Sequence, residues 1–161
     1  MSFAQWSLSL EHAGFFGKYA LGGIYEFNAS HAAELSLGFF TADGGGWNYQ
    51  SNLAYRNSLW RVPWKEKIWV PLQVGVFTIY SLDGRRFFLQ SPSKYPDAAY
   101  YDQTALRWGL EFGTSLIFQE NRYALSYHFR ILDNGFVAIY NNFRRDLQYY
   151  VSSGINFQYQ F

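Results

Sequence analysis

The chain has 161 residues, of which 16% are charged and 22% aromatic, and its formal net charge is +1. This length predicts a single domain over residues 1–161, and the near-neutral charge argues against nucleic acid as a partner. The absence of cysteine excludes disulfides and thiolate metal sites. No run of about 18 apolar residues exists, which excludes a transmembrane helix.

Apolar and polar residues alternate along almost the whole chain, and a period of two is typical of β-strands with two different faces. Eight such runs cover, in chain order, roughly residues 3–12, 17–28, 31–42, 46–60, 67–80, 103–118, 122–131 and 148–161. Most of the runs exceed the roughly 5–6 residues that are usual for strands of soluble proteins. They match the roughly 9–11 residues that a tilted strand needs to cross a bilayer.

The connections between the runs differ in length. The stretches "NAS", "RVPWKE" and "QEN" are short and polar, whereas "AGFFG", "TADGGG" and the segment 81–102 are longer or less regular. Short turns on one rim and longer loops on the other are typical of an up-and-down barrel with both termini on the short-turn rim. We therefore predict an all-β fold, an eight-stranded antiparallel up-and-down transmembrane β-barrel. Pro71 departs from the pattern because proline cannot donate a ladder hydrogen bond.

The alternation separates two faces of different chemistry. One face carries leucine and valine in the strand centres and aromatic residues near the strand ends, as in a lipid-facing band between aromatic girdles. Its members include Leu8, Leu21, Leu35, Leu53, Val70, Leu72, Val76, Leu110, Leu125, Phe157 and Phe161. The other face is small and polar, and we expect it to point into the barrel.

The charged residues of the polar face are nearly balanced in sign. They are Glu11, Glu26, Glu34, Arg56, Arg107, Glu111 and Arg130, with His128 beside them. Buried charges are costly unless they are paired, so we expect these side chains to pair with one another. Eight strands enclose a space that side chains just fill, which predicts a polar, side-chain-filled lumen and no open pore.

Two of the longer connections carry basic residues. These residues are Arg85, Arg86, Lys94, Arg144 and Arg145. A guanidinium group binds phosphate through two parallel N–H groups, so one interpretation is a set of contacts to lipopolysaccharide at the membrane rim. The other interpretation is a pair of ordinary exposed loops with interfacial anchors.

The final stretch, "SSGINFQYQF", places an aromatic or aliphatic residue at every second position up to a last phenylalanine. With Tyr159 and Phe161 it resembles the C-terminal assembly signal of Gram-negative outer-membrane proteins. The resemblance implies insertion by the barrel-assembly machinery, a location in the outer membrane and contact with outer-membrane lipids.

The stretches "GFFGKYALGGIYEFNASHAAELSLGFF" and "LRWGLEFGTSLIFQENRYALSYHFR" resemble small barrels of the lipid A deacylase family. That family carries a catalytic His-x-Ser on strand seven and a glutamate about a dozen residues later, which complete a Ser-His-Glu triad. His128 matches the histidine, but Arg130 stands where the serine is required and residues 140–142 contain no carboxylate. The resemblance therefore implies a deacylase-like scaffold that lacks the family's catalytic set.

His128 and Ser126 share the polar face and are candidates for a general base and a nucleophile, with Asp133 nearby in the sequence. The alternative is that His128 is a buried histidine hydrogen-bonded to Glu111. No HxH spacing supports a metal site, and no cofactor is predicted. The predicted function is therefore that of a monomeric outer-membrane barrel with a structural or surface-interaction role. The alternative function is deacylation of lipid A or a phospholipid by His128.

Overall fold

The structure is a computed structural model that describes residues 5–41, 47–82, 106–118, 122–133, 135–136, 140 and 150–161. Its strands are β1 (Gln5–His12), β2 (Tyr19–Glu26), β3 (His31–Thr41), β4 (Trp47–Ser58), β5 (Val62–Trp64), β6 (Lys67–Ser81), β7 (Leu106–Phe118), β8 (Tyr123–Leu132) and β9 (Val151–Gln160). Within this described part, no helix is long and apolar enough to span a membrane.

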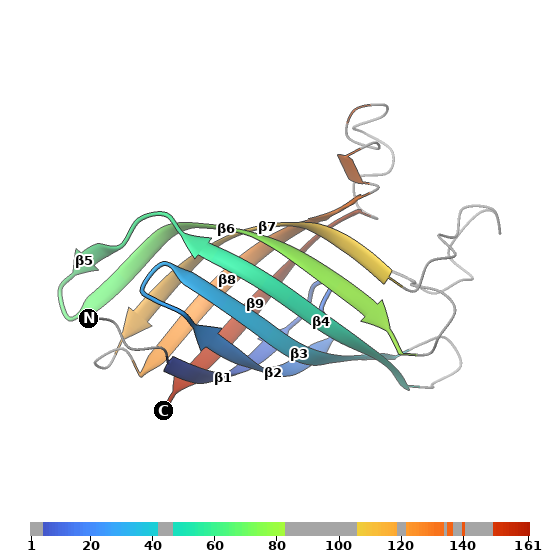
Figure 1. Cartoon of the computed structure of the whole chain (residues 1–161), viewed down its shortest axis with the longest axis horizontal. Helices are drawn as coiled ribbons and strands as arrows, with labels where there is room; N and C mark the ends of the chain where they lie inside the picture. The colour runs from blue at the N-terminus through green and yellow to red at the C-terminus, as the bar shows by residue number, and fades with distance from the viewer. Residues whose placement is uncertain are drawn as a thin grey trace.

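Eight of these strands form a closed barrel, and β5 lies outside the ring (Figure 1). Successive strands of the ring pair antiparallel, β4 pairs with β6, and β1 pairs with β9. The pairing of β1 with β9 closes the sheet, so no strand of the ring keeps a free edge. The predicted all-β, eight-stranded antiparallel barrel is confirmed, with strand bounds close to the predicted runs.

The alternation of the sequence becomes an alternation of burial, because successive side chains of a strand point to opposite faces. In β3, Glu34 and Ser36 are buried. Leu35 and Leu37, which alternate with them, are exposed. Leu35 lies opposite Leu53 of β4, so neighbouring strands share the same inner and outer faces.

Val70 of β6 has the opposite orientation to the one predicted. The alternation places Val70 on the apolar outer face, but the residue is buried and lies opposite the inward-facing Ser115. The register between β6 and β7 shifts between Val70 and Gln73, a segment that contains Pro71. A bulge moves the following residues to the other face because the side-chain period is two. The prediction for Val70 is therefore wrong, and the proline marks the cause.

The connection "RVPWKE" is not the simple turn that the sequence predicts, because part of it forms a strand. Its Val62 pairs with Trp69 and its Trp64 with Lys67, which makes a β5–β6 hairpin. At the tip of this hairpin, Lys65 adopts a φ of 56°. The hairpin lies at the end of the barrel where β1 begins and β9 ends (Figure 1). A strand of 3 residues that includes a proline gives no periodic signal, so the sequence did not predict β5.

The connection between β1 and β2 folds into the opposite end of the barrel. Phe15 and Phe16 are buried, and their carbonyl oxygens accept hydrogen bonds from the amides of Gln50 (2.6 Å) and Asn52 (3.1 Å). A Cβ atom on Gly38 would overlap the Phe16 carbonyl, so glycine is needed at this position for the close approach.

This inward connection builds an apolar layer inside the barrel. The members of the layer are Phe15, Phe16, Ala20, Ala54, Phe77, Ile79 and Leu132. The Phe16 and Phe77 rings meet edge to face with centroids 5.8 Å apart, a favourable arrangement for aromatic pairs. The alternation alone predicts a polar interior and gives no sign of this layer.

Candidate functional site in the barrel interior

Glu111 of β7 lies at the centre of a buried group of charges. Its Oε2 accepts a hydrogen bond from Arg130 Nε of β8 at 2.5 Å, and its Oε1 accepts one from Arg56 Nε of β4. Arg56 Nη2 lies 3.5 Å from Glu111 Oε2. One carboxylate therefore bridges two guanidinium groups from strands on different sides of the ring.

Two further carboxylates complete the group. Glu34 Oε2 of β3 lies 2.6 Å from Arg56 Nη1, and Glu11 Oε2 of β1 accepts a hydrogen bond from Arg130 Nη2 at 2.8 Å. We call Glu11, Glu34, Arg56, Glu111 and Arg130 the charge cluster. No side chain of the charge cluster is more than 4% exposed. Burial of this kind is tolerated only when charges are paired and hydrogen-bonded, as they are here.

Polar neighbours satisfy the ends of the charge cluster. Ser9 Oγ donates a hydrogen bond to Glu34 Oε1 at 2.7 Å, and Asn156 Nδ2 donates one to Glu11 Oε2 at 3.5 Å. All of these residues lie on the polar face of their strands, which the sequence alternation assigned to the interior. The five residues of the charge cluster were all among the seven predicted to pair.

The other two predicted residues lie apart from the charge cluster. Arg107 is buried but pairs with Asp133, its Nε lying 3.0 Å from Asp133 Oδ1. Asp133 was not among the predicted partners, because it follows the end of β8, where the alternation stops. Glu26 is half-buried and lines a pocket near the end of β2. The expectation that all seven would pair with one another is therefore wrong for these two.

Arg130 connects the charge cluster to the apolar layer. Its Cζ atom lies 3.6 Å from the centre of the Phe16 ring and 5.9 Å from that of Phe77. A guanidinium over an aromatic face gains cation–π attraction, which is strongest when both groups are shielded from water. The Phe15 amide donates to Ser152 Oγ at 3.0 Å, which further fixes the inward connection.

The two catalytic candidates are buried side by side without forming a dyad. Ser126 Oγ lies 2.7 Å from Ser115 Oγ, and Ser115 Oγ donates to Gln73 Oε1 at 2.7 Å. His128 Nδ1 lies 3.3 Å from Glu111 Oε1. Among the described residues, neither ring nitrogen of His128 has a hydrogen-bond partner. Within the described ranges, no base contacts the Ser126 hydroxyl.

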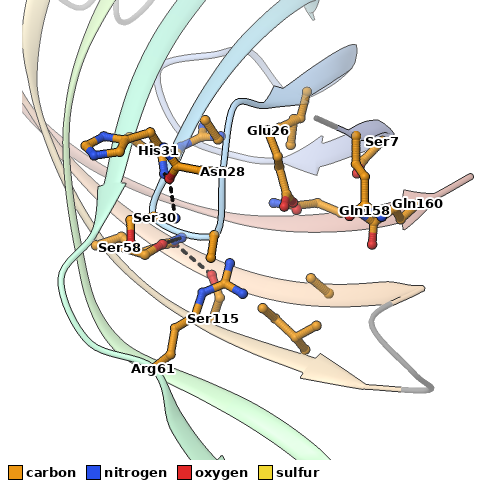
Figure 2. Close-up of a pocket in the computed structure, with 18 of the residues that line it drawn as sticks. Ser7, Glu26, Asn28, Ser30, His31, Ser58, Arg61, Ser115, Gln158 and Gln160 are labelled. Atoms are coloured by element: carbon orange, nitrogen blue, oxygen red, sulfur yellow. Dashed lines mark hydrogen bonds between the residues drawn. The ribbon is translucent and has the colours of Figure 1, made fainter. Parts of the chain in front are cut away.

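A polar pocket of about 120 Å³ opens into the interior at the end where β1 begins and β9 ends. Figure 2 shows Glu26, Arg61 and Gln158 around it, contributed by strands and turns from different parts of the chain. Gln73 Nε2, another side chain of its lining, donates to Ser58 Oγ at 3.1 Å. Arg56 also lines the pocket, so the charge cluster forms part of its wall.

Three further predictions concern the C-terminal aromatic residues, the basic residues of the long connections and metal ligands. Tyr159 lies in β9 opposite Leu8, its ring 5.3 Å from that of Tyr123, and the Phe161 ring is 5.4 Å from the Tyr159 ring. The predicted lipopolysaccharide contacts lie outside the described residues; they are Arg85, Arg86, Lys94, Arg144 and Arg145. No group of three or more potential metal ligands occurs in the part of the chain that the structure describes.

Comparison with protein-family models, with curated proteins and with solved structures finds no match. Function is therefore inferred from the barrel, the charge cluster and the outer surface.

Proposed function

We propose that the chain is an integral outer-membrane β-barrel whose strands span the bilayer, with a structural or surface-interaction role and without an open pore. The observation that carries this proposal is an inverted distribution of side chains. Leu35 is 61% exposed and Leu53 is 52% exposed, whereas Glu111 is 2% exposed and Arg130 is fully buried. Soluble domains place these residue types the other way round.

The apolar outer surface is too extensive for a protein in water. Its strand centres are covered by Leu8, Leu10, Leu21, Leu35, Leu37, Leu53, Val76, Leu125 and Ile155. Exposure of apolar surface to water costs a free energy of roughly 25 cal/mol per Å². Continuous exposed apolar patches larger than a few hundred Å² therefore mark interaction surfaces. A soluble barrel that holds a fatty ligand would instead carry its apolar face inside.

Aromatic residues gather near both ends of the strands. At one end, the Trp6 and Tyr25 rings are 4.8 Å apart. At the other end, the Phe39 and Tyr49 rings are 5.7 Å apart. Two aromatic belts that flank an aliphatic band are typical of barrels that sit across both interfaces of a membrane. The distribution thus supports a membrane-spanning orientation for the strands.

The filled interior supports the absence of a pore. The charge cluster crosses the ring from β1 to β4, and the apolar layer lies beside it. Eight-stranded barrels have interiors that side chains just fill. We therefore infer that the barrel has no conduction path.

The location in the Gram-negative outer membrane rests on the resemblance of Tyr159 and Phe161 to the assembly signal. Insertion by the barrel-assembly machinery is part of the same proposal. Contact with lipopolysaccharide through the basic residues of the long connections remains a prediction. The deacylase alternative finds no support in the interior, because Ser126 and His128 are buried and unconnected.

The proposal is tested by placing arginine on the outer face. In vesicles, Leu53→Arg should lower the free energy of unfolding by about 2–4 kcal/mol, because its charge would lie near the bilayer centre. The matched control is Leu82→Arg, just beyond the end of β6, where the loss should be about 0–1 kcal/mol. Urea titration monitored by tryptophan fluorescence measures both. A wild-type protein that is folded and monodisperse in water without detergent would contradict the proposal.

A further inference from the structure

The β5–β6 hairpin forms one wall of an apolar groove of about 690 Å³. On this wall, Val62 and Trp69 are directly opposite each other across the hairpin, and Trp64 follows Val62 on the same face. All three side chains are exposed. An exposed apolar wall on a projecting hairpin is unusual unless something covers it.

The outer surface of the barrel forms the other wall. Leu116 of β7, Leu125 of β8 and Ile155 of β9 line it. These residues belong to the apolar outer face of the ring, so the groove is continuous with the surface that we propose to contact lipid. Its volume lies in the range of roughly 300–1,000 Å³ that is typical of sites for small ligands.

Hydrogen bonds hold the groove in shape. The Trp69 indole Nε1 donates to Thr114 Oγ1 at 3.1 Å, and Thr114 Oγ1 donates to the Val70 carbonyl at 2.9 Å. The bulge at Pro71 lies just beyond these contacts in β6. Bulges bend a strand locally, which accounts for the departure of the hairpin from the ring. The groove is thus present before any occupant arrives.

The tip of the hairpin is basic. Lys65 and Lys67 are exposed there together with the single acidic residue Glu66, and Arg61 is exposed at the base of the hairpin, just before β5, which gives a formal charge of +2 over residues 61–67. Tryptophan and basic residues at the edge of an apolar surface are the groups that anchor proteins at the level of lipid headgroups.

From this combination we infer that the groove binds an anionic glycerophospholipid, with an acyl chain between the hairpin and the barrel and the phosphate at Lys65 and Lys67. The inference rests on the proposed membrane location. A lipid fits the groove better than a protein does, because the groove is continuous with the apolar outer face and the hairpin has a basic, headgroup-level tip. Each basic residue near an anionic lipid adds appreciable attraction, which favours an acidic headgroup over a zwitterionic one.

The test uses vesicles of phosphatidylglycerol and phosphatidylethanolamine in equal parts. After mild extraction, native mass spectrometry should show phosphatidylglycerol retained on the wild type in preference to phosphatidylethanolamine. Replacing both lysines, Lys65→Ala with Lys67→Ala, should lower the relative affinity for phosphatidylglycerol about 30-fold. Lys18→Ala, at the other end of the barrel, removes an exposed cation and should leave the preference unchanged.

The groove itself is tested by filling it. Leu125→Trp should abolish retention of both lipids, whereas Leu35→Trp on β3, away from the groove, should not. Loss of retention with Leu35→Trp as well would overturn the site. A dimer that Leu125→Trp dissociates would assign the groove to a second copy and overturn the lipid. A wild type that inserts and resists proteolysis but retains neither lipid overturns this inference alone. A wild type that fails to insert overturns the proposed function.

Discussion

The two ends of the barrel interior are filled in opposite ways. Toward the β1–β2 connection, Phe15 and Phe16 turn inward and complete an apolar layer. At the end where β1 begins and β9 ends, the interior is a polar pocket of about 120 Å³. The charge cluster joins them, because Arg130 stacks on Phe16 and Arg56 lines the pocket. One end depends on precise packing, whereas the other is open to solvent, so the two ends should differ sharply in their tolerance of substitution.

The largest loss of stability on substitution is expected in the charge cluster, where the two ends of the interior meet. Glu111→Ala leaves Arg56 and Arg130 each without one buried carboxylate, and should reduce the free energy of unfolding by about 3–5 kcal/mol. Denaturant titration in lipid vesicles measures the loss. Glu66→Ala, at the exposed tip of the hairpin, is the matched control and should change stability by less than about 0.5 kcal/mol. Equal effects for the two glutamates would refute the central role of Glu111.

The packed end is tested by shortening Phe16. Phe16→Ala should cost about 3 kcal/mol, because it removes the ring that meets Phe77 and Arg130. Phe16→Leu keeps most of the apolar volume but loses the aromatic face, so its cost should be about 1–2 kcal/mol. The difference between the two variants in the same unfolding assay separates packing from stacking. A leucine variant as unstable as the alanine variant would show that the arginine contact dominates.

The smallest loss of stability on substitution is expected at the polar pocket, the end of the interior that is open to solvent. Gln158→Ala changes a half-buried side chain of the pocket lining and should alter stability by less than about 0.5 kcal/mol. Two positions earlier in β9, Asn156 is fully buried and donates to Glu11. Asn156→Ala should therefore cost about 1–2 kcal/mol. Thermal melts of the two variants in one detergent compare them directly, and a reversed order would contradict the difference between the two ends.

Alternation made much of the barrel predictable from sequence. A strand side chain has only two faces to choose from, so the period of two assigns Glu34 and Leu35 to opposite sides without knowledge of the tertiary structure. The same logic placed Glu111 and Arg130 on one face, and the near balance of charge anticipated their pairing. The strand period alone predicts the inner or outer position of a side chain where that position depends only on the residue's own strand.

The features that escaped prediction are those that depend on other segments. Val70 was misplaced because the bulge at Pro71 changes the side-chain parity, and the position of a bulge is not set by alternation. Phe16 lies in a connection without periodicity, and its inward turn is fixed by contacts to Asn52 and Arg130, far away in sequence. Asp133 was missed as the partner of Arg107 because it follows the end of β8.

The closure of the ring by β1 and β9 has a kinetic consequence. Leu8 pairs with Tyr159 and Leu10 with Phe157, so this ladder joins the first and last described strands. Contacts between such distant segments carry a large loop-closure entropy and form slowly. Until they form, β1 and β9 each present an unpaired edge that can recruit a strand from another chain. The yield of refolding should therefore fall as protein concentration rises, because intermolecular pairing competes with this last step.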